Sequence, residues 1–251
     1  GPIHFMPGNM VVTYDEFNLE QAHFSLNDHN VDTVKAKGMD FKHLDITDIF
    51  LIASDGAVTA DTITTQIAKL SAKDRCGFEL KNLSGKAQVS TTDITVEGME
   101  ILTPNSRIQN YFSLQYAHFR DFKDFLNKVR IKASLGDTKV ALADLAHFVP
   151  GISVVGHNTL SVSGNIDGRI NNLKGRGLNV RTGKGTVFAG NFYMRGLPQI
   201  FETSIHLKVD RMTTNAADIS RIYPALKLPA NIATLGDVKY SGTIDGFVTD
   251  M

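Results

Sequence analysis

Apolar and polar residues alternate along most of the chain. Ile94-Thr95-Val96 and Ile205-His206-Leu207-Lys208-Val209 are two such runs. A period of two places the apolar members on one face of a β-sheet and the polar members on the other. Turn-forming pairs such as Asp55-Gly56, Glu97-Gly98 and Asp167-Gly168 separate many of the runs at intervals of about ten residues. The sequence therefore predicts a mainly β fold of many antiparallel strands.

Three segments depart from this alternation and predict short helices. Residues 120–129 place apolar side chains at helical spacing, and residues 141–149 and 215–223 are short helical patterns that each end before a proline. Such helices have two possible roles beside a sheet. They cap or plug one end of it, or each merely covers a local patch.

Part of the sequence is repeated. Residues 160–173 (LSVSGNIDGRINNL) match residues 238–251 (VKYSGTIDGFVTDM) at a spacing of 78, and residues 144–150 match residues 218–224 at a spacing of 74. A weaker similarity relates residues 82–86 to residues 172–176. Repeats of this kind are typical of structures that grow along one axis. We expect one continuous, elongated β architecture over residues 3–251, with function carried by a long surface.

Composition excludes several classes of protein. The 251 residues include 26 basic and 26 acidic side chains, so the chain lacks the basic excess typical of nucleic-acid binders. The single cysteine, Cys76, excludes an internal disulfide, and no apolar run is long enough to span a membrane. Gly1-Pro2 resembles the remnant of a cleaved tag. We therefore expect an excised piece of a larger protein.

Signatures of enzymes and metal sites are absent from the sequence. The chain has no HExxH motif, the segment 151–156 lacks the GxSxG spacing of a nucleophile elbow, and the glycines of 183–190 lack the GK[ST] of a phosphate loop. We expect no catalysis, no cofactor and no metal. The basic residues Lys174, Arg176, Arg181 and Lys184 either meet lipid phosphates or form a solvated strand face.

Several phrases together resemble one protein family. LKNLSGKAQVS (80–90), TPNSRI (103–108), FKDFLNKV (122–129) and DLAHFVPGI (144–152), followed by SGxIDG at 163–168 and 241–246, resemble the periplasmic region of TamB-type translocation and assembly module proteins. These belong to the AsmA-like superfamily, and the likeness is to its Bacteroidetes branch. The resemblance covers roughly residues 40–251.

The resemblance implies a fold and a function. Such proteins are anchored in the inner membrane by an N-terminal helix and extend into the periplasm as a curled antiparallel β-sheet, called a β-taco or repeating β-groove. The apolar groove is thought to conduct phospholipid acyl chains between the inner and outer membranes. The family also implies an Omp85-type outer-membrane barrel as a partner and a role in outer-membrane protein assembly.

We therefore expect a non-catalytic lipid-conducting scaffold whose groove is lined by residues of the alternating runs. An ordinary dry core has the same pattern and remains the alternative for each residue. Two other functions stay open: a chaperone-like platform for β-barrel insertion, and a β-solenoid adhesin or polysaccharide-binding protein. The expected lining residues are Leu44, Ile46, Phe78, Leu80, Val89, Ile94, Val96, Leu160, Val162, Ile166, Ile170, Leu207, Val209, Val238, Tyr240 and Ile244.

Overall fold

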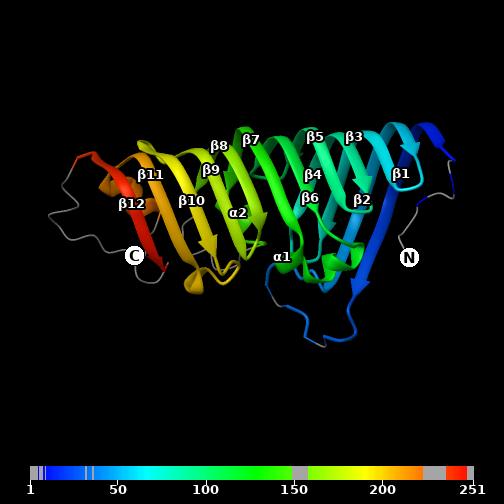
Figure 1. The fold of residues 1–251 in the computed structure, drawn as a ribbon, viewed down its shortest axis with the longest axis horizontal. Coiled ribbons are helices and arrows are strands. Elements are labelled where there is room, and N and C mark those ends of the chain that lie inside the picture. Colours follow the sequence, from blue (N-terminus) through cyan, green and yellow to red (C-terminus); the bar gives the residue numbers. More distant parts are fainter. Residues whose placement is uncertain are drawn as a thin grey trace.

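Twelve strands lie side by side in chain order and form one antiparallel sheet in the computed structural model (Figure 1). The structure describes residues 5, 8, 10–31, 33–35, 37–148, 158–222 and 236–247. The mainly β, antiparallel prediction is confirmed. The strands are β1 (Val12–Asn27), β2 (His43–Val58), β3 (Thr62–Asp74), β4 (Glu79–Ser90), β5 (Asp93–Leu102), β6 (Arg107–Gln115), β7 (Arg130–Ala141), β8 (Thr159–Arg169), β9 (Asn172–Thr182), β10 (Thr186–Arg195), β11 (Ser204–Thr214) and β12 (Val238–Phe247).

Short helices occupy the three segments where the alternation stops. A 3-10 helix, η1 (Phe119–Asp124), continues into α1 (Phe125–Lys128) between β6 and β7. Helix α2 (Leu142–Leu145) follows β7, and α3 (Ala216–Ile222) follows β11. A further 3-10 turn, η3 (Ile200–Glu202), precedes β11. The helical predictions are confirmed for the described residues. The prolines expected to end α2 and α3 lie outside them.

One row of directly paired residues, which we call the apolar row, crosses all twelve strands. It contains only aliphatic side chains, one methionine and two glycines. Because paired residues lie on the same face, the register places the whole row on one face of the sheet, here called the apolar face. The row consists of Val12, Val58, Ile63, Val89, Ile94, Leu114, Ile131, Gly168, Leu173, Met194, Ile205 and Gly246.

The adjacent row, one residue along each strand, lies on the opposite face and is mainly polar. We call that side the polar face. The two rows show that the period-two pattern is kept at this level of every strand, although bulges shift the register elsewhere in each pair. The polar row consists of Thr13, Ala57, Thr64, Gln88, Thr95, Ser113, Lys132, Asp167, Lys174, Tyr193, His206 and Asp245.

Bulges near the middle of the strands curl the sheet about its long axis (Figure 1). Gly164 in β8 shows why a glycine is needed at such a position. Its φ is +125°, and an added Cβ would stand 2.8 Å from the carbonyl oxygen of Gly177 and 2.9 Å from the Cα of Leu178. Only a residue without a side chain combines that backbone conformation with so close an approach of the next strand.

The curled sheet buries a small core on its apolar face. Val96, Met99, Leu178 and Val209 all lie on the apolar face and are at most 6% exposed. No second sheet covers them among the residues that the structure describes. Their burial therefore places the apolar face on the inner side of the curl.

The sheet consists of three repeats of four strands each, β1–β4, β5–β8 and β9–β12. A Ser-Gly pair with a positive glycine φ marks the last strand of each repeat: Ser84-Gly85, Ser163-Gly164 and Ser241-Gly242. The structure thus corrects the weaker similarity inferred from sequence. Residues 82–86 belong to β4, the counterpart of β8 and β12, whereas residues 172–176 begin the first strand of the third repeat.

Candidate functional site: the apolar face

Fourteen of the residues expected to line a groove lie within strands and share the apolar face. They are Leu44, Ile46, Leu80, Val89, Ile94, Val96, Leu160, Val162, Ile166, Leu207, Val209, Val238, Tyr240 and Ile244. Two do not follow the strand pattern. Ile170 lies in the turn between β8 and β9, and Phe78 lies in the connection before β4.

Several of these residues belong to a second apolar row, which crosses ten strands from β3 to β12 beside the first. Only its first member, a threonine, is polar, and the row places Ile166 in the middle of the sheet and Ile244 at its edge. Together the two rows make the apolar face continuous from one end of the sheet to the other. The second row consists of Thr65, Ala87, Val96, Phe112, Ala133, Ile166, Gly175, Phe192, Leu207 and Ile244.

Aromatic side chains join the two long edges of the curled sheet. Connections from odd to even strands run along one edge, and those from even to odd strands run along the other, because each connection reverses the chain. Phe41, from the β1–β2 connection, stacks on Phe125, from the β6–β7 connection, with ring centroids 5.3 Å apart and planes at 13°. The two edges are therefore in contact across the open side of the curl at this point.

Phe41, Phe125, Phe122, Phe119 and Tyr116 form a chain of ring contacts, here called the aromatic bridge. Tyr116 anchors it to the sheet. Its ring packs against Phe119 at 5.2 Å and against Phe122 at 4.9 Å, while its hydroxyl donates to the carbonyl oxygen of Ser90 at 2.7 Å. Burial, with a contribution from the nearby Asp93, raises the pKa of Tyr116 to about 12. The hydroxyl therefore stays protonated and keeps its role as a donor.

Two carboxylates hold the helices α2 and α3 against the sheet. Asp144 accepts from Thr103 Oγ1 and Ser106 Oγ (2.5 Å each) and from Asn105 Nδ2 (3.0 Å). Burial alone would raise its pKa, but these hydrogen bonds outweigh burial and hold the pKa of Asp144 below its ordinary value. The sequence repeat had placed Asp144 and Asp218 in equivalent positions without revealing this role.

Asp218 has an even stronger set of donors. The backbone N–H groups of Lys184, Gly185 and Thr186 and the Thr186 hydroxyl all donate to it at 2.8–3.2 Å. These donors, the Lys184 and Gly185 amides first, lower the pKa of Asp218 to about 2 although the side chain is only 1% exposed. The carboxylate thus remains charged over the whole physiological range.

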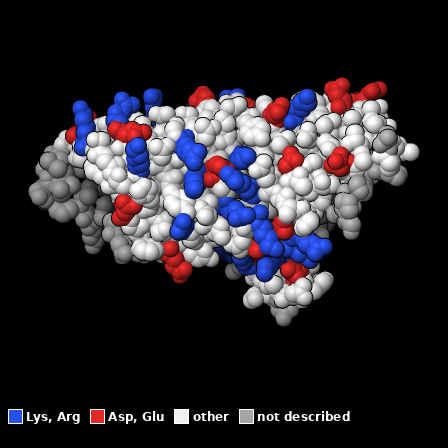
Figure 2. All heavy atoms as spheres, viewed as in Figure 1, with Lys and Arg blue, Asp and Glu red and all other residues white. Residues whose placement is uncertain are grey.

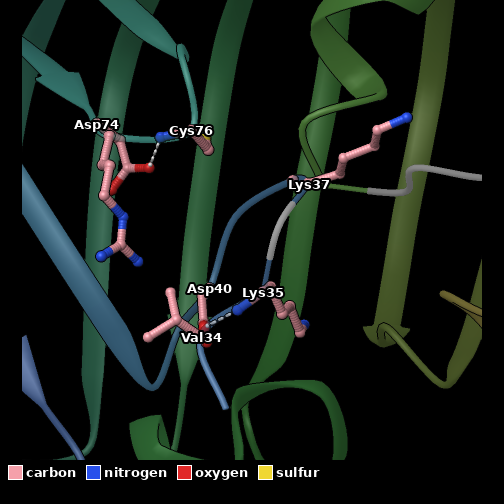
Figure 3. Close-up of a pocket in the computed structure, with 8 residues that line it drawn as sticks. Val34, Lys35, Lys37, Asp40, Asp74 and Cys76 are labelled. Atoms are coloured by element: carbon pink, nitrogen blue, oxygen red, sulfur yellow. Dashed lines mark hydrogen bonds between the residues drawn. The ribbon is translucent and has the colours of Figure 1, made fainter.

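A pocket of about 510 Å³ lies between the β1–β2 and β3–β4 connections, and Asp40, Asp74 and Cys76 are among the residues that line it (Figure 3). Within it, the Lys35 amide donates to Asp40 at 2.9 Å, and the Cys76 amide donates to Asp74 at 2.8 Å. Burial, followed by the hydrogen bond to Asp74, raises the pKa of the Cys76 thiol to about 11. The thiol is therefore protonated at neutral pH and is a poor nucleophile.

The polar face carries a cluster of basic side chains over its middle strands (Figure 2). Arg130 donates to both oxygens of Asp167 at 2.6 Å, which lowers the pKa of Asp167. Lys174 lies with its ammonium 5.1 Å from the centre of the Tyr193 ring. Lys174 and Arg176, two of the basic residues noted in the sequence, thus lie on the face opposite the apolar row.

No group of three or more His, Cys, Asp or Glu side chains in the described part of the chain is placed to hold a metal ion. No helix there has the length and apolar character needed to cross a membrane. Comparisons with protein-family models, with curated proteins and with solved structures found no match to this chain. The continuous apolar face is thus the feature from which a function is best argued.

Proposed function

We propose that the apolar face binds phospholipid acyl chains and lets them pass along the sheet, as in the TamB-type proteins that the sequence resembles. The observation that supports this proposal is the apolar row, which contains no polar side chain in any of the twelve strands. Each buried methylene of an acyl chain contributes about 0.8 kcal/mol. Binding at successive strands is then similar in energy, so that sliding from one strand to the next has a low barrier.

The proposal also follows from what the single sheet has to cover. A sheet with one apolar face buries that face against a second layer, against itself or against a guest molecule. Here buried residues of the apolar face, such as Val96 and Val209, lie near the middle of their strands, while apolar residues nearer the strand ends, such as Leu160 and Ile205, remain partly exposed. We propose that acyl chains complete the burial of these partly exposed residues.

The aromatic bridge limits the direction in which a bound acyl chain can move. Where Phe41 and Phe125 join the edges, a bound chain has no sideways exit. Movement is then confined to the long axis, along which twelve strands spaced at about 4.8 Å extend for roughly 50 Å. In the setting implied by the resemblance, the protein acts in the periplasm as part of an inner-membrane-anchored chain with an outer-membrane barrel as partner.

Lipid co-purification with matched charge variants tests the proposal. Ile166→Asp places a carboxylate on the second apolar row, whereas Asn165→Asp places the same group one residue away on the polar face. We expect native mass spectrometry to detect phospholipid bound to the wild type and to Asn165→Asp, with loss of the lipid from Ile166→Asp because a charge in an apolar path is poorly solvated.

A second pair keeps the test decisive if Ile166→Asp unfolds. Ile244 belongs to the same row but lies on the terminal strand β12, next to the exposed polar-face residue Thr243. We expect Ile244→Asp to lower lipid occupancy and Thr243→Asp to leave it unchanged. Absence of lipid from the wild type, or equal occupancy in folded inner-face and polar-face variants, would exclude acyl-chain binding to this face.

A further inference from the structure

Within the part of the chain that the structure describes, the two outer edges of the sheet are unpaired and carry exposed apolar side chains. No other strand among the described residues pairs with the outer edge of β1 or of β12. Five large hydrophobic residues on these two strands are exposed, whereas none on β2 to β11 is. The apolar row ends at Val12 and Gly246, and the second apolar row ends at Ile244, each with a neighbour on one side only. The five residues are Val12, Phe17, Phe24, Val238 and Phe247.

The internal junctions between repeats show what such an edge binds. In both junctions, β4–β5 and β8–β9, the last strand of one repeat pairs antiparallel with the first strand of the next, and the register is the same when the Ser-Gly pairs are aligned. The equivalent pairs are Leu83–Ile101 and Val162–Val180, Ala87–Val96 and Ile166–Gly175, and Val89–Ile94 and Gly168–Leu173.

The two free edges belong to strands of these same two kinds. β12 is the third strand with a Ser-Gly bulge, since Gly242 has φ +146° beside +140° for Gly85 and +125° for Gly164. β1 shares a left-handed residue with the first strands of the other repeats: φ is +54° at Gln21 and +57° at both Gly98 and Gly177. The free edge of β12 is thus the one that β4 and β8 use, and the free edge of β1 is the one that β5 and β9 use.

We propose that β12 pairs antiparallel with β1 of a second copy of this chain, so that the sheet continues from one molecule into the next. The register of the internal junctions places Ile244 opposite Leu19, Gly246 opposite Phe17 and Thr243 opposite Glu20. The even number of strands preserves the antiparallel alternation from copy to copy. The apolar face of one molecule then continues into that of the next.

Charge is compatible with this pairing and orders the assembly. In the proposed register Glu20 faces Thr243 and Asp245 faces Asn18, so no two like charges lie directly opposite one another. A symmetric pairing of β1 with β1 would instead bring together two strands that each carry Asp15, Glu16 and Glu20. The contact is head to tail and does not close, so it produces open-ended chains of molecules. This proposal rests on the repeat and is independent of lipid binding.

Disulfide trapping between two differently labelled chains tests the register. Cys76→Ser removes the native thiol, and Thr243→Cys and Glu20→Cys are then introduced into separate chains at exposed positions. Directly opposite residues of antiparallel strands have Cβ atoms about 5 Å apart, close enough for a disulfide to form with little adjustment. We expect a mixture of the two variants to yield a linked heterodimer under mild oxidation.

Controls decide among the alternatives. Replacing Glu20→Cys by Asn18→Cys moves the thiol by two residues on the same face, and the linked product should be lost. Linked homodimers from Thr243→Cys alone or from Glu20→Cys alone would show β12–β12 or β1–β1 pairing and overturn the proposal. Sedimentation equilibrium of the wild type should show mass increasing with concentration. A monomer at all concentrations would overturn the proposal as well.

Discussion

Asp144 and Asp218 perform the same task in consecutive repeats, 74 residues apart. Each lies on the helix that follows the third strand of its repeat, and each accepts hydrogen bonds from the turn between the first two strands of that repeat. A residue near one end of the repeat thus fixes a turn near its beginning. The carboxylates hold together strands that are not adjacent, along the same edge of the sheet.

Removing these carboxylates should lower the free energy of unfolding unequally. Asp218→Ala leaves three backbone N–H groups without an acceptor, so we expect a loss of about 3 kcal/mol. Asp144→Ala should cost less, about 1–2 kcal/mol, because the donors left behind are side-chain groups, and the Thr103 hydroxyl has an alternative acceptor in the carbonyl oxygen of Ser106. Urea denaturation followed by circular dichroism measures both, and Asp210→Ala, at an exposed site on β11, should change stability by less than about 0.5 kcal/mol.

The same carboxylates predict the acid limb of the stability curve. The pKa of Asp218 is about 2 in the folded chain, and those of Asp144 and Asp167 are also lowered, so the folded state binds fewer protons than the unfolded state below about pH 4. Their stabilisation is complete above that pH and is lost as the pH falls through the folded pKa values. Thermal unfolding should show a Tm that decreases from about pH 4 to pH 2. Asp218→Asn should flatten this dependence, and an unchanged slope would refute the assignment.

The bulge glycines should tolerate substitution according to their backbone conformation. Gly164→Ala brings a Cβ against β9 at a φ of +125°, and we expect a loss of about 2 kcal/mol or more. Gly136→Ala on β7 is the matched control, because the nearest atom to its added Cβ is 3.8 Å away. It should change the free energy of unfolding by less than about 1 kcal/mol. Equal effects of the two substitutions would mean that the bulge does not bend the sheet as described.

Cys76 should react slowly with alkylating reagents in the folded protein. Because its pKa is raised to about 11 from an ordinary value near 9, its thiolate fraction at pH 8 is roughly a hundredfold lower than that of a free cysteine. Iodoacetamide labelling followed by mass spectrometry should show a rate reduced to a similar extent, with the ordinary rate restored in urea. Rapid labelling of the folded chain would contradict a partly buried, neutral thiol.

Local pattern was enough to predict the class of fold. In Ile94-Thr95-Val96 the two apolar side chains face inward and Thr95 lies on the polar face, because a half-buried strand requires a period of two. The segment 120–129 predicts a helix because its apolar residues change to helical spacing.

Features that depend on distant contacts could not be predicted from the sequence. The three Ser-Gly positions share a backbone conformation but not a sequence: Ser84-Gly85 is followed by Lys-Ala-Gln, whereas the other two pairs continue into Ile-Asp-Gly, so the sequence repeat relates only two of the three strands and pairs residues 82–86 with the wrong strand. The stacking of Phe41 on Phe125 joins residues on opposite edges of a curl that no local pattern specifies. Ile170 continued the alternation in sequence but occupies a turn, because the strand pairing ends at Arg169 and Asn172.

Photocrosslinking from neighbouring residues tests most directly whether the apolar face binds acyl chains. A benzophenone amino acid at Ile166 faces the inside of the curl, whereas the same probe at Asn165 faces the polar side. With vesicles of labelled phospholipid, we predict that the Ile166 probe links to lipid and that the Asn165 probe does not. Equal labelling from both positions, or none from the Ile166 probe in a folded protein, would contradict the account.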